Sequence, residues 1–201
     1  MKISFPNPYG YKLPSKDRVA SIQKDYKFSD DYASFLLSQN GFLVSSLEED
    51  IRKNDYLSES EEDSEGKPGF RVLYGLNSND KYYDLEDNLQ SFIFKDYFFP
   101  IGSDYGGNDF VEILAGKFKG YIASLDHELY AAFDSLEEFI EEFKLENFDE
   151  LPKGEKTDML SSDNIGIAWI VAPSMQIFTE NCIHCDSEFC GYVLDLISKE
   201  S

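Results

Sequence analysis

Asp126, His127 and Glu128 are three consecutive residues whose side chains could transfer protons. General acid–base catalysis needs such groups within hydrogen-bond reach of one substrate atom. Because the residues follow an apolar run at 121–125, we expect them to end a strand, where neighbouring side chains point to opposite faces. Asp126 and Glu128 would then share one face while His127 points away. We therefore favour a cap on the strand end, with a partner-binding face and catalysis as the alternatives.

A second group, Cys182, His184 and Cys185 with Cys190 beyond it, has the residue types of a metal site. Zinc normally takes four ligands, often as two pairs separated by a loop. Only one pair stands here, His184 directly adjoins Cys185, and His127 would have to complete the set. We expect the cysteines to pack as small apolar side chains. Nucleophilic catalysis commonly pairs a Ser or Cys with a histidine, and the chain has 2 histidines. We therefore expect a non-enzymatic protein without a metal or cofactor.

The glycine-rich segment 102–109 raises the question of phosphate binding. A phosphate loop needs a Lys and a Ser or Thr after its last glycine, or three glycines that open a helix. Neither pattern is present, and two aspartates, Asp104 and Asp109, would repel an anion. We expect Gly106, Gly107 and Asn108 to form a tight turn that requires positive φ and leads into a strand.

The most unusual feature of the overall composition is the large negative net charge. The 201 residues include 39 acidic and 18 basic side chains, which gives −21 at pH 7. Such a field repels phosphate backbones and anionic membrane surfaces and attracts basic partners. We expect a protein partner with a basic surface and no direct contact with nucleic acid or membrane. The alternative is that the acidity serves solubility alone.

The sequence also indicates where the protein works. No segment approaches the roughly 18 consecutive apolar residues of a membrane span, and the N-terminus lacks the apolar run and cleavage site of a signal peptide. The 3 cysteines all fall between 182 and 190, which is an odd and local set rather than a disulfide framework. We expect a cytoplasmic protein.

Two short helices are predicted in the first 40 residues. Ser15 can cap one and Ser29 the next, and the sequence Asn40-Gly41 is typical of a helix end. Residues 45–69 then interrupt the globular pattern, with a short helix expected near 47–57 and an exposed acidic loop after it. The loop is either an insertion without a role or a docking surface for a basic partner.

The remaining pattern predicts a sheet followed by helices. Strands are expected at 70–76, 110–113 and 121–125, with a turn between the last two. A capping box at Ser135 begins a helix that buries the aromatic face of 136–143. A buried strand is expected at 164–170, and a last helix or strand at 192–197. This order indicates an α+β fold with an antiparallel or mixed sheet.

Four segments stand in an order and spacing that a known family shares. They are Phe99-Pro100-Ile101-Gly102, Gly106-Gly107-Asn108, Leu125-Asp126-His127-Glu128 and Phe133-Asp134-Ser135-Leu136-Glu137-Glu138-Phe139-Ile140. Between Phe28 and Phe143 the chain thereby resembles the SMI1/KNR4 family of the SUKH superfamily. The resemblance implies an α+β fold with a curved, mostly antiparallel sheet and helices packed against it. It also implies a protein-binding module, in bacteria usually an immunity protein that neutralises a polymorphic toxin, often a nuclease, by tight binding.

On this basis we expect one domain at 1–150, with an acidic insertion at 45–69 and a C-terminal extension at 151–201 packed on the same domain. The candidate partner contacts are the exposed acids of the insertion and of the turn and strand ends. They are Glu59, Glu61, Glu62, Asp63, Asp104, Asp109, Asp126 and Glu128. The alternative function is a regulatory or scaffold protein of the SMI1/KNR4 type that binds a cellular protein.

Overall fold

The computed structural model describes residues 12–43, 70–78, 81–104, 106–161, 165 and 167–182. The helices within these ranges are α1 (Lys16–Tyr26), α2 (Asp30–Ser38), α4 (Leu85–Ser91), α5 (Leu136–Glu142), α6 (Lys153–Leu160) and α7 (Met175–Cys182). Two 3-10 turns, η1 (His127–Leu129) and η2 (Phe148–Glu150), accompany them. The strands are β1 (Phe42–Leu43), β2 (Phe70–Leu73), β3 (Phe98–Asp104), β4 (Asp109–Ile113), β5 (Ile122–Leu125) and β6 (Ala168–Ala172).

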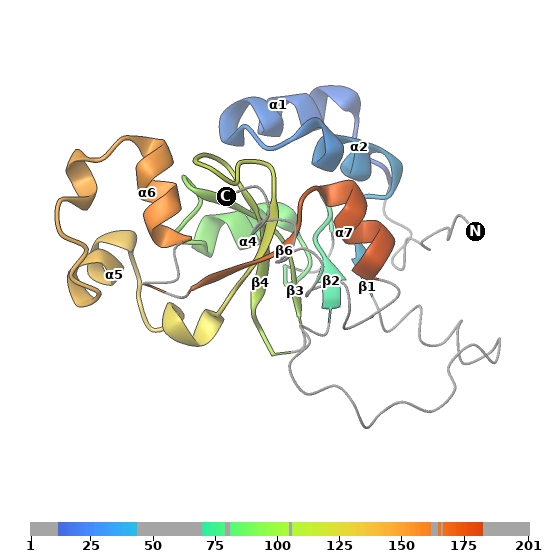
Figure 1. Cartoon of the computed structure of the whole chain (residues 1–201). Helices are drawn as coiled ribbons and strands as arrows, with labels where there is room; N and C mark the ends of the chain where they lie inside the picture. The colour runs from blue at the N-terminus through green and yellow to red at the C-terminus, as the bar shows by residue number, and fades with distance from the viewer. Residues whose placement is uncertain are drawn as a thin grey trace.

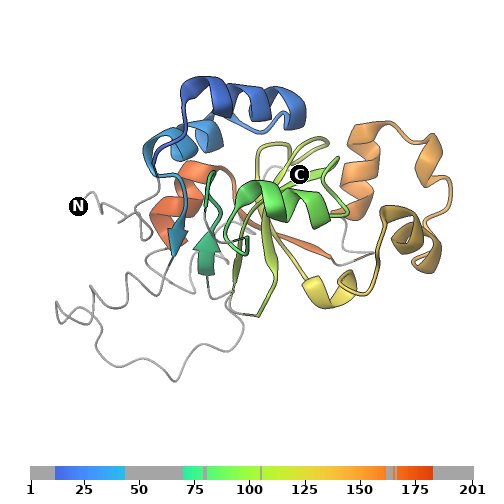
Figure 2. The ribbon, with the colours of Figure 1, turned by 180° about the vertical axis from the view of Figure 1, so that it is seen from behind.

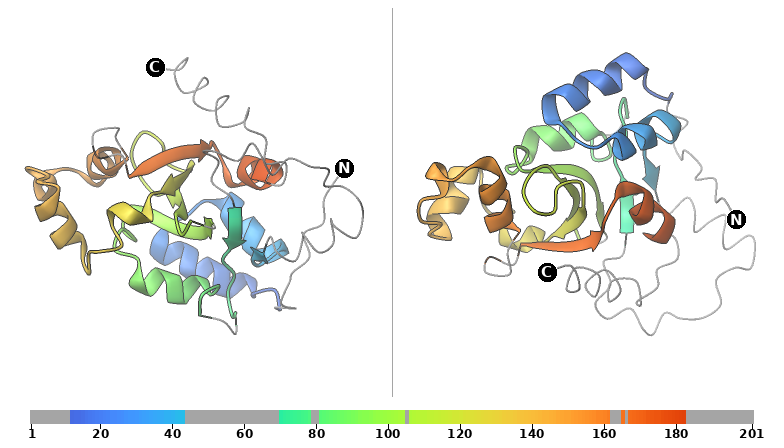
Figure 3. Two further views of the ribbon diagram at one scale, coloured as in Figure 1. Left: turned by 90° about the horizontal axis from the view of Figure 1, so that it is seen from below. Right: turned by 45° about the horizontal axis from the view of Figure 1, so that its top comes forward.

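The six strands form one sheet in which each pairs antiparallel with its neighbour along the chain, in the order β1-β2-β3-β4-β5-β6. The sheet is open and curved (Figure 3). Helices α1, α2 and α7 gather at one side of it, and α5 and α6 lie at the other (Figure 1). From behind, α4 is seen on the sheet near β3, which it contacts (Figure 2). The predicted α+β fold with a curved antiparallel sheet and helices packed against it is confirmed.

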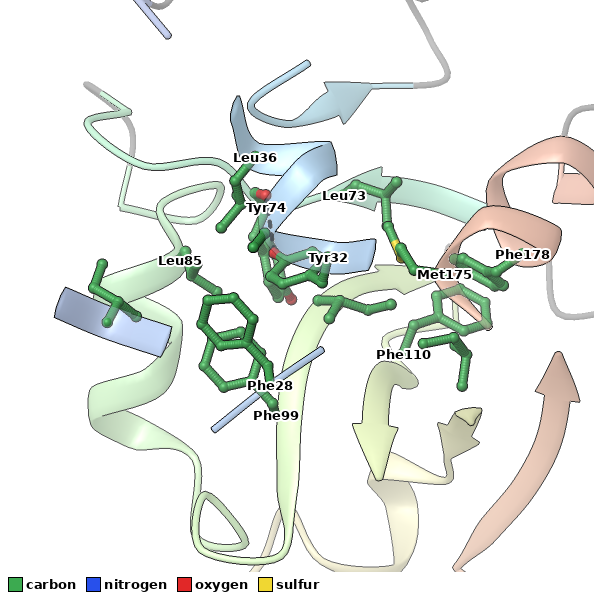
Figure 4. Packing of buried hydrophobic residues seen from close by; sticks show 14 of the residues in the cluster. Phe28, Tyr32, Leu36, Leu73, Tyr74, Leu85, Phe99, Phe110, Met175 and Phe178 are labelled. Atoms are coloured by element: carbon green, nitrogen blue, oxygen red, sulfur yellow. Dashed lines mark hydrogen bonds between the residues drawn. The ribbon is translucent and has the colours of Figure 1, made fainter. Parts of the chain in front are cut away.

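Both faces of the central strands are covered, which is why their side chains are buried without alternation. On β3, Phe99 joins the apolar cluster under α1, α2, α4 and α7, whereas Phe98 joins the cluster under α5 and α6. Phe110 and Val111 divide in the same way on β4. In the first cluster the ring centroids of Phe28 and Phe99 lie 4.6 Å apart (Figure 4). Two buried faces explain the nearly continuous apolar sequence of these strands.

Serine caps begin the first two helices as predicted. The hydroxyl of Ser15 accepts a hydrogen bond from the amide of Arg18, and that of Ser29 accepts one from the amide of Tyr32. After α2, Asn40 and Gly41 both take the left-handed conformation, with φ of 51° and 98°. Such a pair ends a helix because neither continues its backbone geometry. The predicted helix end is therefore confirmed.

Other local predictions need correction or stay open. The strand expected at 164–170 lies at Ala168–Ala172, and Trp169, expected to be buried, is 53 % exposed. In the capping box of α5, Ser135 accepts from the amide of Glu138 as expected, but the Glu138 carboxylate accepts from the amide of Asp134 instead of Ser135. The helix near 47–57, the acidic loop and the element at 192–197 lie outside the described residues.

At Gly102 the backbones of β2 and β3 approach each other closely. A Cβ atom there would lie 2.1 Å from the carbonyl oxygen of Val72 on β2. The pairing register shifts on both sides of Gly102, between Phe70 and Val72 on β2 and between Pro100 and Gly102 on β3 itself. A residue without a side chain is what such close packing at a bulge requires. This glycine of the Phe99–Gly102 segment is thus explained by the sheet.

Two glycines in the β4–β5 connection allow a matched test of the contact with α6. Gly116 and Gly120 have φ of 80° and 85°, but a Cβ at Gly116 would lie 2.1 Å from Oδ1 of Asp158, whereas at Gly120 it would meet nothing within 4 Å. We expect Gly120→Ala to lower the unfolding free energy by about 1 kcal/mol, the conformational cost alone. Gly116→Ala should cost about 1–2 kcal/mol more, because it displaces the carboxylate that accepts from the amide of Lys117. Urea denaturation measures both, and equal losses would contradict the contact.

Candidate functional site

The glycine-rich turn between β3 and β4 is held closed by Asn108. The backbone amide of Asn108 donates to Oδ1 of Asp104 at 2.8 Å, and its side-chain Nδ2 donates to Oδ2 of the same carboxylate at 2.9 Å. Its Oδ1 accepts from the backbone amide of His127 at 3.2 Å. Asp104 is 3 % exposed, so its carboxylate faces the turn and not solvent. Asn108 therefore joins the turn to the segment that follows β5.

Gly107 lets the turn approach the imidazole ring of His127. Its φ is 93°, as the tight-turn prediction required, whereas Gly106 and Asn108 do not have the expected positive φ. A Cβ atom on Gly107 would lie 3.2 Å from Cε1 and 3.4 Å from Nδ1 of His127. Nδ1 is buried and has no hydrogen-bond partner among the described residues. The histidine is thus packed against the turn, and its backbone is bonded to Asn108.

The expected cap on the strand end is present at Asp126, but the expected alternation of side chains over Asp126–Glu128 is not. β5 ends at Leu125, and η1 begins at His127 because the carboxylate of Asp126 accepts from the amide of Glu128 at 3.0 Å. In a 3-10 turn the side chains do not alternate between two faces. Asp126 is half-buried and acts as the cap, while Glu128 is exposed to solvent.

Asp109 is the carboxylate on which two tyrosines from distant parts of the chain converge. Tyr130, which follows η1, donates its hydroxyl to Oδ2, and Tyr74, which follows β2, donates to Oδ1 at 3.3 Å. Burial raises the pKa of Asp109 to about 6, against the opposing effects of these two hydrogen bonds and of His127. Burial and the nearby carboxylate also raise the pKa of Tyr130, so the phenol keeps its proton and remains the donor.

An open pocket of about 450 Å³ lies next to this carboxylate. Its lining residues come from β2 and the residue after it, β3, the turn, the start of β4, the segment before α4, and α4 itself. They are Val72, Tyr74, Tyr82, Tyr83, Asn88, Ser103, Gly107 and Asp109. They range from Val72, which is 2 % exposed, to Tyr82, which is 68 % exposed. The pocket therefore offers aromatic walls and one carboxylate to a ligand that enters from solvent.

The structure brings together half of the predicted partner contacts. Asp104 and Asp109 lie at the two ends of the turn, and Asp126 and Glu128 lie beside it through the contact between Asn108 and His127. The other four, Glu59, Glu61, Glu62 and Asp63, lie outside the described residues, as do His184, Cys185 and Cys190.

Neither a metal-binding cluster nor a membrane-spanning helix is found in the described ranges. Within them, no three His, Cys, Asp or Glu side chains are grouped so that they could hold a metal ion. None of the helices in the same ranges has the length and the apolar character that a membrane crossing requires.

Sequence reasoning missed the tyrosines of the site. Tyr74 and Tyr130 stand 35 and 21 residues from Asp109 in the chain, and their hydroxyls reach it only through the folded sheet. Tyr82 and Tyr83 precede a short helix in a segment without a distinctive pattern. The adjacent aromatic pair in a polar stretch was the one signal that could have drawn attention to this surface.

Among the comparisons with known proteins, one family model matches the chain. The family model described as SMI1 / KNR4 family (SUKH-1) matches residues 13–142. This range begins before α1 and ends with α5, and it includes Gly102, Asn108 and Asp109. No curated protein and no solved structure matches the chain. Because the family model covers more than half of the 201 residues, this chain belongs to the SMI1/KNR4 (SUKH-1) family.

Proposed function

We propose that this protein is a non-enzymatic binding module, and more specifically a bacterial immunity protein that neutralises a basic toxin by direct binding. The observation that carries the proposal is membership of the SMI1/KNR4 family over residues 13–142. The family supports a protein partner. We propose further that this partner is a toxin, with a nuclease as one candidate.

The charge of the chain supports a basic partner. A net charge of −21 steers a positively charged protein into contact and raises the rate of association. A toxin that acts on nucleic acid carries a basic surface for its substrate, and an acidic protein can cover that surface. The same field disfavours nucleic acid and anionic membranes as partners. A cytoplasmic location would place the protein beside such a target.

The bonding of the acidic groups supports binding rather than catalysis. Asp104 is committed to Asn108, Asp126 caps η1, and Asp109 accepts from two tyrosines. Each carboxylate thus holds the turn or the segment after β5 in place. Glu128 is exposed at this surface and free of such a structural bond among those described, so it is available to a partner.

Co-expression with the toxin-like reading frame next to the gene tests the proposal. We expect growth to be rescued and the two proteins to purify together. Continued killing would contradict the immunity function. Isolation of a cellular partner without toxicity would favour the regulatory or scaffold function instead.

Charge reversal tests which acids contact the partner. We expect Glu59→Lys, Glu61→Lys and Glu62→Lys together to lower the association rate constant by at least about tenfold, because steering depends on local charge. Stopped-flow mixing at two salt concentrations measures it.

The matched control for this triple variant reverses three exposed acids of α5. Glu137→Lys, Glu141→Lys and Glu142→Lys change the net charge equally at a different surface. We expect a smaller decrease from the control. Equal decreases would show that only total charge matters, and an unchanged rate in the first variant would exclude the acidic insertion from the interface.

A further inference from the structure

The pocket beside Asp109 has the composition of a site for a cationic side chain. Among its lining residues one is a carboxylate, three are tyrosines, and none is Lys, Arg or His. Asn88 and Ser103 add uncharged polar groups. Such a combination provides a negative charge and aromatic faces without a resident cation.

The carboxylate of Asp109 retains acceptor capacity. A carboxylate offers about four lone-pair sites, and the two tyrosine hydroxyls use one on each oxygen. Burial raises its pKa to about 6, and the charge of Asp104 acts in the same direction. A cation placed against Asp109 would offset both effects, since an opposite charge favours the ionised carboxylate.

The tyrosine faces favour a planar cation over a compact one. Guanidinium groups stack on aromatic rings and bind carboxylates with two hydrogen bonds, whereas ammonium groups act as strongly hydrated point charges. The ring of Tyr82 already attracts a cation, because Nζ of Lys81 lies 5.1 Å from its centroid. Lys81 itself lines the adjacent hollow with Asp87 and Gln90, and not the pocket.

We infer that this pocket receives an arginine side chain of the partner protein, with the guanidinium between the tyrosine rings and against Asp109. The inference rests on the proposed function, since it names the group by which a basic protein would be recognised. An arginine in this open pocket would be partly removed from water and would contact aromatic side chains, as arginine anchors at interface hot spots do.

The test uses small probes and the full chain. Acetyl-arginine amide is titrated into the 15N-labelled protein at pH 7.5 and 150 mM salt, and amide shifts are followed by NMR. We expect saturable shifts at Tyr83, Asn88 and Gly107 with a dissociation constant of about 1 mM, the range for a ligand of this size. Acetyl-citrulline amide, which has nearly the same shape without the charge, should cause none. Acetyl-lysine amide should bind at least about threefold more weakly.

Two variants and one control decide whether the pocket is responsible. Asp109→Asn should lower the affinity at least about tenfold, because it removes the charge. Its one amide oxygen keeps an acceptor for one tyrosine hydroxyl, and its NH2 group can donate to the hydroxyl oxygen of the other. Tyr82→Ala, at an exposed residue, should lower it about threefold without affecting the fold. Glu137→Gln removes the same charge on α5 and should leave the titration unchanged. The thermal midpoint of each variant establishes that it is folded.

Defined results would overturn the inference. Absence of saturation, equal shifts with citrulline, equal affinity for lysine, or unchanged binding in both pocket variants would each exclude an arginine site. These results would leave the proposed function intact if co-expression still rescued growth. Conversely, arginine binding at the pocket without rescue would support the site and contradict the toxin as its partner.

Discussion

Alanine in place of Gly102 should lower the unfolding free energy by about 3 kcal/mol or more, the largest stability effect that we expect from a single methyl group in this protein. The added Cβ would lie 2.1 Å from the carbonyl oxygen of Val72 and 3.0 Å from Cδ2 of Leu73. The first contact is with backbone, which cannot move aside as a flexible side chain can. The β2–β3 pairing of Leu73 with Gly102 would have to open.

The backbone conformation does not account for this loss. The φ of Gly102 lies outside the left-handed region, so alanine would otherwise stabilise the protein slightly by restricting the unfolded chain. Gly154→Ala on α6 is the control, because a Cβ there meets its nearest neighbours at 3.5 Å. We expect that control to be neutral or stabilising by up to about 1 kcal/mol. Chemical denaturation measures both, and a small loss at Gly102 would show that the strands can separate without cost.

Local sequence patterns predicted α1, α2, α5, β2, β4 and β5, but not β1, β3, α4, α6 or α7. Ser15 and Ser29 cap helices through bonds to residues three positions away, and such short-range chemistry is visible in the sequence. The expected alternation of Asp126 and Glu128 against His127 was wrong, because a hydrogen bond from the amide of Glu128 to the Asp126 carboxylate begins a 3-10 turn directly after β5. The prediction of a buried strand failed at Trp169 because β6 is an edge strand with its tryptophan exposed.

The site could be predicted only in part, for a reason that two aspartates illustrate. Asp104 and Asp109 flank the same turn and look equivalent in the sequence. Asp104 bonds to Asn108 four residues away, which is a local interaction. Asp109 instead bonds to Tyr74 and Tyr130, and this pairing depends on how the strands are ordered in the sheet. Charge alone therefore identified the surface but could not separate a turn-stabilising carboxylate from one that borders a pocket.

Glu112 presents a different problem, because it is a buried carboxylate that faces the helices. It is 2 % exposed on β4, and its two oxygens accept from the amide and the hydroxyl of Ser29 at 2.6 and 2.8 Å. Burial raises its pKa to about 7; the hydrogen bonds from Ser29 and the charge of Lys119 oppose this effect, and the charge of Asp31 adds to it. Glu112 thus links the cap of α2 to the sheet through a group whose ionisation is costly.

This linkage makes stability depend on pH in a defined direction. In the unfolded chain Glu112 has its ordinary pKa of 4.5, so between that value and about 7 the folded state binds more protons than the unfolded state. Stability from this group is therefore present at low pH and is lost as pH rises toward 7. Glu112→Gln cannot titrate and keeps a neutral hydrogen-bonding group. From pH 5 to pH 8 we expect the variant to gain about 2.5 kcal/mol relative to wild type.

Urea denaturation at pH values from 5 to 8 measures this difference, and the contribution of Asp109 cancels because both proteins contain it. Glu142→Gln on the exposed face of α5 is the matched control, since it removes a carboxylate that the fold does not bury. Its stability should stay parallel to that of wild type across the range. Parallel curves for Glu112→Gln would instead show that Glu112 ionises as readily in the folded protein as in the unfolded chain. A relative gain confined to the Glu112 variant would identify its carboxylate as the group that weakens the attachment of α2 as the pH rises.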